Sequence, residues 1–454
     1  MTELGKLAIA TLIWLAIIAS SNTTAQAKPQ ADPTQAKTLT GALETWTLEN
    51  GLEVAFVRTR WAPALAVQVW YRVGSKNEPS NRRGTAHMFE HLMFKGSAKV
   101  PPDAHAEQLR SIGGYSNAIT TEDGTAYHNT VPKDQLNYVL ALEADRMRSL
   151  VFDTNTIGAQ RNLIISEIQR NLRSPLYQAV VRFLPLAFPN HPYSWTSGGA
   201  LGDLGRIDTT SLTKFYNTNY VPNNALIVVV GDLDRATVEN AVAKHFNKLE
   251  RGPTIAQPKA PSPLTGQRKT GPSGQLGFAL AGYRIPGAAS PDIYPIQLLS
   301  LILSRGKDSR LFRKLVETKL AVEAGGQAIV RQQPGVFMVF AAFSDPANGD
   351  KAEATLLAEM KNIASQGVSA SELRRAIVQA QAALGFAVQS IDGLAQQIGT
   401  SWVQSGEPGH FANDLDHFAA VSLSDIKAAA KKYFTENNRV VVRLPIAKQK
   451  TKQK

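Results

Sequence analysis

The chain has 454 residues, of which 43% are hydrophobic and 19% are charged, a composition that fits a globular protein of two or three domains and excludes a wholly disordered chain. Cysteine is absent, which excludes disulfides, thiol catalysis and thiolate metal ligands together. The formal net charge of +12 comes without a helix-turn-helix, zinc-finger or aromatic-basic ribonucleoprotein motif, so no nucleic acid partner is expected.

The N-terminal segment has the pattern of a targeting sequence. Lys6 precedes an apolar run from Leu7 to Ile18, and Ala25-Gln26-Ala27 offers a small-x-small cleavage site. We therefore expect residues 1–27 to be a secretory signal peptide. An uncleaved N-terminal anchor is the alternative, although the apolar run is short for a membrane span. No second long apolar segment follows, so we expect no integral membrane segment after processing, and export, most simply to the periplasm of a Gram-negative bacterium.

A flexible leader and then a group of strands are expected next. Residues 28–42 are polar and small, which is typical of a leader without a packed core. The segment from Trp46 to Leu48 leads into the turn Asn50-Gly51, and Leu52 to Val57 follows, which predicts a β-hairpin. Leu65 to Tyr71 alternates as a further strand.

The segment His87-Met88-Phe89-Glu90-His91 carries the strongest chemical signal of the chain. On a helix, His87 and His91 project from one face, one turn apart, with Glu90 beside them. Two neutral imidazoles can bind one divalent metal, most often zinc, and the carboxylate can take a proton from a metal-bound water. The order His-x-x-Glu-His is the inverzincin signature. A helix with two surface histidines is the alternative interpretation of this segment taken alone.

A catalytic zinc site needs a third protein ligand, and its fourth position holds water. Glu167 is the best candidate, because Ile164, Ile165 and Ile168 surround it and an unpaired carboxylate is costly to bury among aliphatic side chains. A glutamate that faces solvent from an amphipathic helix is the alternative.

An interdomain linker is predicted at residues 251–274, where five prolines accompany glycine and lysine and apolar periodicity is almost lost. The chain repeats its outline on either side of this stretch. A helix from Thr210 to Tyr220 precedes the strand Leu226 to Val230 in the first half. A helix from Ser424 to Tyr433 precedes the strand Val440 to Val442 in the second half.

This repetition predicts an α+β fold of two homologous domains that arose by internal duplication, each a mainly antiparallel sheet packed with helices. The N-terminal domain covers residues 43–250 and carries the zinc motif, whereas the C-terminal domain covers residues 275–445. Its corresponding stretch, Leu298 to Leu303, contains no histidine. Residues 446–454 form a basic tail. A coincidence of two helix–turn–strand units is the alternative.

The zinc motif and its surroundings resemble the pitrilysin family of zinc peptidases, which includes insulysin and the mitochondrial processing peptidases. Glu167 follows His91 by 76 residues, and the resemblance extends over residues 43–445. Most of the further motifs that carry the resemblance lie in the first half. They are Arg83-Gly84-Thr85-Ala86, Leu92-Met93-Phe94-Lys95-Gly96-Ser97, Gly113-Gly114-x-x-Asn117-Ala118-x-Thr120, Glu143-Ala144-Asp145-Arg146-Met147 and His191-Pro192-Tyr193.

The resemblance implies that the chain binds one Zn²⁺ through His87, His91 and Glu167, with Glu90 as the general base that activates a zinc-bound water. It also implies that a peptide substrate adds as a β-strand to the segment that contains Asn117 and Ala118. The expected activity is that of a zinc-dependent endopeptidase, which hydrolyses peptides or unfolded segments in an enclosed chamber.

The chain departs from the family pattern in two places. Family members often carry a glutamate seven residues before the ligand glutamate, where this chain has Gln160. The segment Ser309-Arg310-Leu311-Phe312 resembles the C-terminal signature of the family, after which many relatives have an arginine and, seven residues later, a tyrosine that bind substrate carbonyls. This chain has Val316 and Glu323 at those positions.

The missing Arg/Tyr pair suggests that a homologous partner subunit supplies it, so that this chain is the catalytic subunit of a heterodimer; a homodimer is the other possibility. A non-catalytic scaffold or assembly subunit of the same fold is the alternative function, although such family members typically have degenerate zinc motifs. A metal carrier without hydrolytic activity would not need Glu90 beside its ligands.

Overall fold

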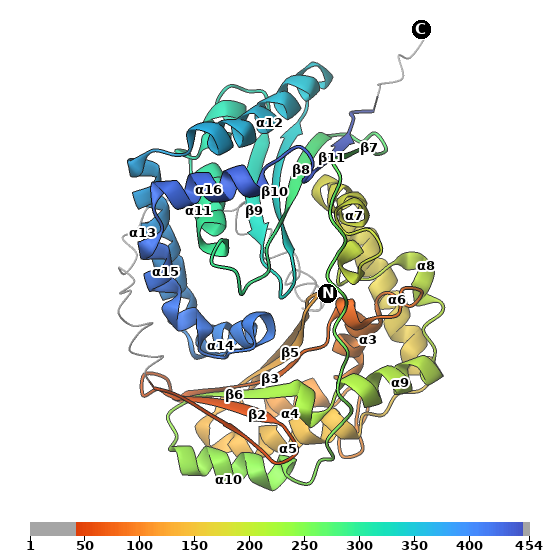
Figure 1. Ribbon diagram of the computed structural model, residues 1–454. Coiled ribbons are helices and arrows are strands. Elements are labelled where there is room, and N and C mark those ends of the chain that lie inside the picture. The colour runs from red at the N-terminus through yellow and green to blue at the C-terminus, as the bar shows by residue number, and fades with distance from the viewer. Residues whose placement is uncertain (1–41, 448–454) are drawn as a thin grey trace.

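The computed structural model describes residues 42–447. The expected signal peptide lies outside the described residues, as do almost all of the expected leader and most of the basic tail. The described chain forms two halves, each built on one β-sheet, and Figure 1 shows the two sheets facing each other across the molecule.

The first sheet has six strands and the second has five. The strands are β1 (Leu43–Thr47), β2 (Glu53–Arg58), β3 (Ala64–Tyr71), β4 (Tyr115–Thr120), β5 (Thr125–Pro132), β6 (Ala225–Gly231), β7 (Gln267–Thr270), β8 (Gly277–Ile285), β9 (Glu323–Ile329), β10 (Gly335–Phe343) and β11 (Arg439–Leu444). The α-helices are α3 (Thr85–Leu92), α4 (His105–Ser111), α5 (Leu136–Arg148), α6 (Thr154–Asn171), α7 (Pro175–Ala187), α8 (Leu201–Leu204), α9 (Thr209–Asn219), α10 (Arg235–Phe246), α11 (Ile293–Ser304), α12 (Gly349–Gln366), α13 (Ala370–Ala387), α14 (Ile391–Ser405), α15 (Asp414–Ala420) and α16 (Leu423–Tyr433).

The two sheets have the same topology. Their strand orders are β1-β2-β6-β3-β5-β4 and β7-β11-β8-β10-β9, which match one for one once the edge strand β1 is set aside. In each sheet a single pair is parallel, β2 with β6 and β7 with β11, and all other neighbours are antiparallel. The predicted α+β class and the internal duplication are therefore confirmed.

Each half contributes one helix that covers the sheet of the other half. α7 from the first half packs against β8 and β11, and α14 from the second half packs against β3 and β6 (Figure 1). Phe183 of α7 and Trp402 of α14 are fully buried in the two cores that result. The remaining helices of each half form a further core on the opposite face of its own sheet. The second face of either sheet is thus protected from water only when both halves are present.

The local causes of these elements agree with the sequence pattern. The predicted hairpin forms between β1 and β2, and Gly51 in its turn has φ +88°, a conformation that suits glycine. Every residue of β6 is buried, which explains its unbroken apolar run, because helices cover both faces of the sheet there. The helix starts at α6 and α9 are capped by the side chains of Asp153 and Asp208.

The linker is shorter than the expected 251–274. Residues 251–266 contain no helix or strand, but β7 (Gln267–Thr270) pairs in parallel with β11 and forms the edge of the second sheet. The short β7 is polar, which suits an exposed edge strand and hides its signal in the sequence. Ile446, expected in the basic tail, forms a bridge with Gly274, so the second half extends slightly further than predicted. Between residues 42 and 447, no helix has both the length and the hydrophobicity that crossing a bilayer requires.

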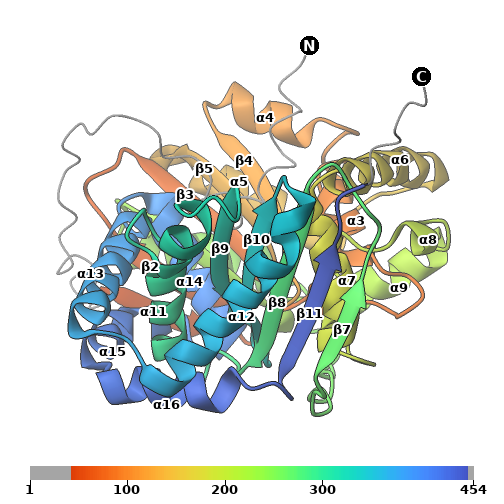
Figure 2. The same ribbon diagram turned by 90° about the horizontal axis from the view of Figure 1, so that it is seen from above.

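Figure 2 shows α4 (His105–Ser111) beside the edge strand β4, and His105 at its start is an unusual core residue. The imidazole is 2% exposed, and neither ring nitrogen has a hydrogen-bond partner in the described structure. Burial, with a smaller contribution from Arg146, lowers the pKa of His105 to about 2. The ring packs edge-on against Phe94 at 5.5 Å between centroids.

His105→Leu is expected to stabilise the fold, most strongly at acid pH. Below pH 6.5 this histidine binds a proton in the unfolded chain but stays neutral in the folded chain. The wild-type free energy of unfolding therefore falls as pH falls, by about 1.4 kcal/mol per pH unit from this residue. Leucine has a similar volume and leaves no unpaired nitrogen, which is worth about 1–3 kcal/mol at neutral pH. Urea unfolding at pH 7 and pH 5 measures both effects. An identical pH dependence in the two proteins would contradict the assignment.

Candidate metal centre

The helix α3 presents the zinc motif to a cavity between the two halves. Met88, Phe89 and Leu92 point into the core of the first half and are fully buried. The opposite face of α3 carries His87, Glu90 and His91, all of which line the cavity. Since the helix is amphipathic, core packing on one side orients the motif on the other.

The helix α6 brings Glu167 to the two histidines. Glu167 Oε2 lies 3.3 Å from His87 Nε2 and 3.8 Å from His91 Nε2. The neighbouring Ile164 and Ile168 pack into the core, whereas Glu167 itself faces the cavity with its side chain 20% exposed. The sequence predicted that aliphatic side chains enclose this carboxylate. The structure instead places the carboxylate on the cavity side of an amphipathic helix.

His87, His91 and Glu167 form the one group among residues 42–447 whose ligand atoms converge as a metal site requires, all within 4.8 Å of one another. Four ligands at about 2.0–2.2 Å from a tetrahedral zinc ion lie roughly 3.3 Å apart. The separation between His87 and Glu167 matches this value, and that between His91 and Glu167 is slightly wider. Two imidazole nitrogens and one carboxylate oxygen are also a typical donor set for zinc. The residues present therefore fit a zinc ion.

The charges of the site are interdependent. Burial acts to raise the pKa of Glu167, but the hydrogen bond and charge of His87 outweigh it and hold the pKa below its usual value. For His87, burial acts to lower the pKa, and the contact with Glu167 together with the charge of Glu90 raises it overall. Burial and the neighbouring His87 lower the pKa of His91. The protonation of each of these three side chains therefore depends on its neighbours.

Gln160, which also lines the cavity, contacts His91 through a ring nitrogen. It stands two helical turns before Glu167 on α6, is buried, and its Oε1 lies 3.3 Å from His91 Nδ1. An amide oxygen there accepts the Nδ1 proton and leaves Nε2 free to bind a metal. Gln160 can therefore make this hydrogen bond without adding a negative charge next to the ligands.

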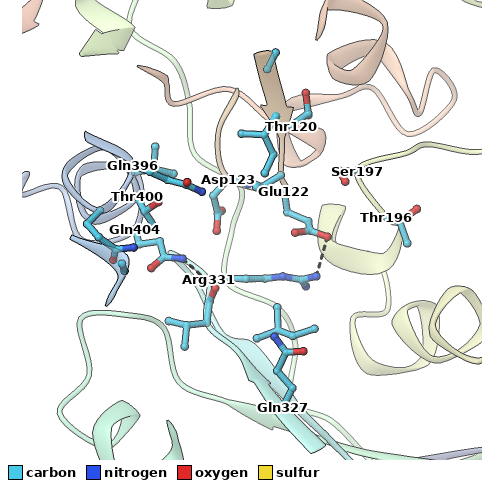
Figure 3. Close-up of a pocket in the computed structure, with 18 of the residues that line it drawn as sticks. Thr120, Glu122, Asp123, Thr196, Ser197, Gln327, Arg331, Gln396, Thr400 and Gln404 are labelled. Atoms are coloured by element: carbon cyan, nitrogen blue, oxygen red, sulfur yellow. Dashed lines mark hydrogen bonds and ion pairs between the residues drawn. The ribbon is translucent and has the colours of Figure 1, made fainter. Parts of the chain in front are cut away.

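The cavity has a volume of about 2240 Å³ and is bordered by both halves. This volume exceeds the roughly 300–1,000 Å³ of ordinary small-molecule sites, so the cavity has room for a peptide segment. Uncharged side chains of α14 project into it: Gln396, Thr400 and Gln404 lie at successive turns (Figure 3). Arg331 of the second half also lines the cavity and forms an ion pair with Glu122 of the first half at 3.0 Å.

The edge strand β4 runs along the cavity wall. It pairs with β5 on one side alone, so its other edge is open within the described sheet. Asn117 and Ala118 both line the cavity, and Asn117 Oδ1 is buried without a hydrogen-bond partner. A buried acceptor without a partner is costly, so a donor that reached Asn117 Oδ1 from the cavity would be bound favourably.

Comparisons with known proteins agree with this geometry. The model of the Insulinase (Peptidase family M16) family matches residues 53–190, and that of the Peptidase M16 inactive domain matches residues 206–380. The chain belongs to peptidase family M16, the pitrilysin family. The first match lies within the first half and includes the metal motif, whereas the second begins at residue 206 in the first half and extends to residue 380 in the second.

Several M16 relatives match over nearly their whole length. The chain is 28% identical over 410 residues to the zinc protease PqqE of Helicobacter pylori, which covers 88% of this chain and 92% of that protein. It is 26% identical to the mitochondrial-processing peptidase subunit beta of Lentinula edodes, over 87% of this chain and 88% of that one. The crystal structure of a protease from Helicobacter pylori superimposes with a TM-score of 0.83 at 27% identity and covers 88% of this chain and 99% of that chain.

Val316 and Glu323, where the family resemblance led us to expect an arginine and a tyrosine, do not line the cavity. Val316 ends a single helical turn (Phe312–Val316), and Glu323 begins β9 with its side chain exposed. Arg310 of the preceding signature pairs with Glu359 and Glu372 and so has a structural role in the second half.

The sequence pattern did not indicate some of the residues that line the cavity or hold the helix α3. Gln396, Thr400 and Gln404 are separated from α3 by some 300 residues and follow no chemical motif. Their spacing of four residues marks one face of a helix, but nothing in the sequence shows which space that face adjoins. Glu78, which caps α3, was also missed, because its carboxylate reaches the helix start from outside the usual capping spacing.

Proposed function

We propose that this chain is a zinc-dependent endopeptidase that cleaves peptides or unfolded segments. The observation that carries the proposal is the convergence of His87, His91 and Glu167 beside Glu90, at the wall of a 2240 Å³ cavity bordered by the open edge of β4. The names of the M16 relatives, zinc protease and processing peptidase, support it.

The chain's own residues account for the steps around the metal. His87, His91 and Glu167 would hold the zinc ion, which would supply Lewis-acid chemistry for the scissile carbonyl and for a water molecule. Glu90, on the cavity face beside these ligands, would take a proton from the attacking water and deliver it to the leaving nitrogen. The edge of β4 pairs with the backbone of an extended substrate, which gives affinity with little sequence preference.

Removal of the metal is the primary test of the proposed function. We expect the purified chain to contain one Zn²⁺ and to cleave a pool of unstructured peptides. Cleavage should stop after treatment with a chelator and return on addition of Zn²⁺. A chain that contains stoichiometric zinc and is inactive alone would point to a missing subunit, whereas a chain that binds no zinc would favour a non-catalytic scaffold subunit.

Asn117→Ala is expected to weaken substrate binding without slowing the chemical step. Loss of one hydrogen bond that a substrate completes should raise KM by about five- to tenfold and leave kcat unchanged. Steady-state kinetics with an extended peptide measure both constants. Asn129→Ala is unsuitable as a control, because Asn129 donates a hydrogen bond to buried Glu143. Ser111→Ala on the exposed end of α4 is the matched control. An unchanged KM for Asn117→Ala would contradict a role of this side chain in binding.

We also propose that the active form contains a second, homologous chain. The support is the lack of an arginine and a tyrosine at Val316 and Glu323, together with the similarity to a peptidase subunit. A heterodimer or a homodimer would meet this need, and light scattering combined with activity of the chain alone distinguishes them.

Export remains part of the proposal, through the N-terminal residues 1–27, and N-terminal sequencing of the secreted protein tests it.

A further inference from the structure

A buried carboxylate from outside the zinc-motif helix holds the start of that helix. Glu78 is 5% exposed, and its side chain accepts hydrogen bonds from the backbone N–H of Gly84 at 3.0 Å and of Ala86 at 2.8 Å. These are two of the N–H groups that a helix start leaves without an internal partner. Since α3 has only eight residues, its own hydrogen bonds cannot keep it ordered. Its geometry therefore depends on the contacts at its ends.

A third donor joins Glu78 to the loop that lies next to His87. Trp195 Nε1 donates to Glu78 Oε2 at 3.0 Å. The residues that follow, Thr196, Ser197 and Gly198, line the cavity. His87 lines the same cavity as Gly198, and its Nδ1 is buried without a hydrogen-bond partner in the described structure. The Glu78–Trp195 contact thus ties the loop and the helix start together around this histidine.

The same loop touches the helix start through two glycines. A Cβ atom on Gly199 would lie 2.4 Å from the Cα of Gly84, so the two backbones are in direct contact. Gly84 is the N-cap of α3 and has φ +102°, which a residue with a side chain rarely adopts. The loop and the start of α3 therefore leave each other little room to shift.

The segment that carries Glu78 is itself anchored at its other end. Lys76 Nζ donates to Asp123 Oδ1 at 3.1 Å, and both side chains are buried. Asp123 also accepts the backbone N–H of Gln332, in the second half, at 2.9 Å. The segment that carries Glu78 is thus fixed by contacts with the turn after β4 and with the second half. Glu78 therefore cannot move together with α3 if that helix shifts.

We propose that Glu78 and Trp195 are positioning residues of the metal centre, which set the first turn of α3 and through it the place of His87 relative to Glu167. The inference rests on the proposed zinc function. Neither side chain lines the cavity, so both act only through α3 and the adjoining loop. Loss of their contacts should lower the affinity for Zn²⁺ without weakening peptide binding.

Two variants and one control test this proposal with Zn²⁺ alone as the probe. Glu78→Gln keeps the size of the side chain but removes one acceptor oxygen, and Trp195→Phe keeps an aromatic ring but removes the N–H. The control Asp234→Asn removes a carboxylate cap from α10, a helix that does not line the cavity. Competition with a colorimetric chelator measures Zn²⁺ affinity, and the visible spectrum of the Co²⁺-substituted protein reports the ligand geometry.

We expect Glu78→Gln to lower Zn²⁺ affinity by about 10–100-fold, as is typical when the partners that orient a metal ligand are lost. Trp195→Phe should lower it on the order of fivefold. Both variants should alter the Co²⁺ spectrum, and at saturating Zn²⁺ both should lower kcat for a peptide with KM unchanged. Asp234→Asn should match the wild type in every readout.

The outcomes separate this inference from the proposed function. A wild-type chain that binds no Zn²⁺ would overturn the proposed function. A wild-type chain that binds Zn²⁺ together with folded variants of unchanged affinity and unchanged Co²⁺ spectrum would overturn the positioning roles alone. If Glu78→Gln fails to fold, Trp195→Phe decides, because it deletes a single donor and retains most of the packing.

Discussion

Glu90→Gln is expected to lower peptide hydrolysis by about 10²–10⁴-fold while the chain still binds one Zn²⁺. Glutamine has nearly the same size as glutamate but cannot take a proton from water at neutral pH. Glu90 lies on the cavity face of α3 but is not one of the three converging ligands, so the metal should remain. Peptide kinetics and zinc analysis of the same preparation measure the two effects.

The control for this variant is Glu107→Gln, on the exposed side of α4 and away from the cavity lining. It removes the same charge and should leave kcat and zinc content unchanged. Peptide hydrolysis that persists in Glu90→Gln at the wild-type rate would show that another group acts as the base. A loss of zinc in this variant would instead place Glu90 among the ligands.

Glu167→Ala is expected to remove both the metal and the activity. Two histidines alone leave the site without its third protein ligand, so Zn²⁺ affinity should fall by more than the roughly 10–100-fold typical of losing a ligand's hydrogen-bond partner. The fold should persist, because the side chain faces the cavity and contributes little to the core. Equilibrium dialysis against Zn²⁺, together with circular dichroism, measures metal binding and folding separately.

Gln169→Ala, two residues further along α6 and exposed, is the matched control and should bind Zn²⁺ as the wild type does. A Glu167→Ala protein that keeps stoichiometric zinc with unchanged affinity would mean that a different residue completes the site. The structure offers no second converging group of this kind between residues 42 and 447, so that result would contradict the arrangement described.

The sequence by itself was sufficient for the features that depend on short-range periodicity. His87, Glu90 and His91 lie on one helical face because positions four apart coincide on any α-helix, and α3 has this geometry. The β1–β2 hairpin followed from Asn50-Gly51, and the duplication followed from repeated helix–strand outlines that the two strand orders now confirm.

The tertiary structure decided what depends on how distant elements pack. The distance between Glu167 and the histidines is set by the contact of α6 with α3. The local sequence made Glu167 a candidate, but the family resemblance was needed to choose a ligand over a solvent-facing glutamate. The exchange of α7 and α14 between the halves, and with it the cavity, follows from burial of the second face of each sheet. The role of Glu78 likewise depends on a chain reversal that brings a carboxylate to a helix start six residues away. Local periodicity determines which face of an element is polar, but only the packed core determines what that face meets.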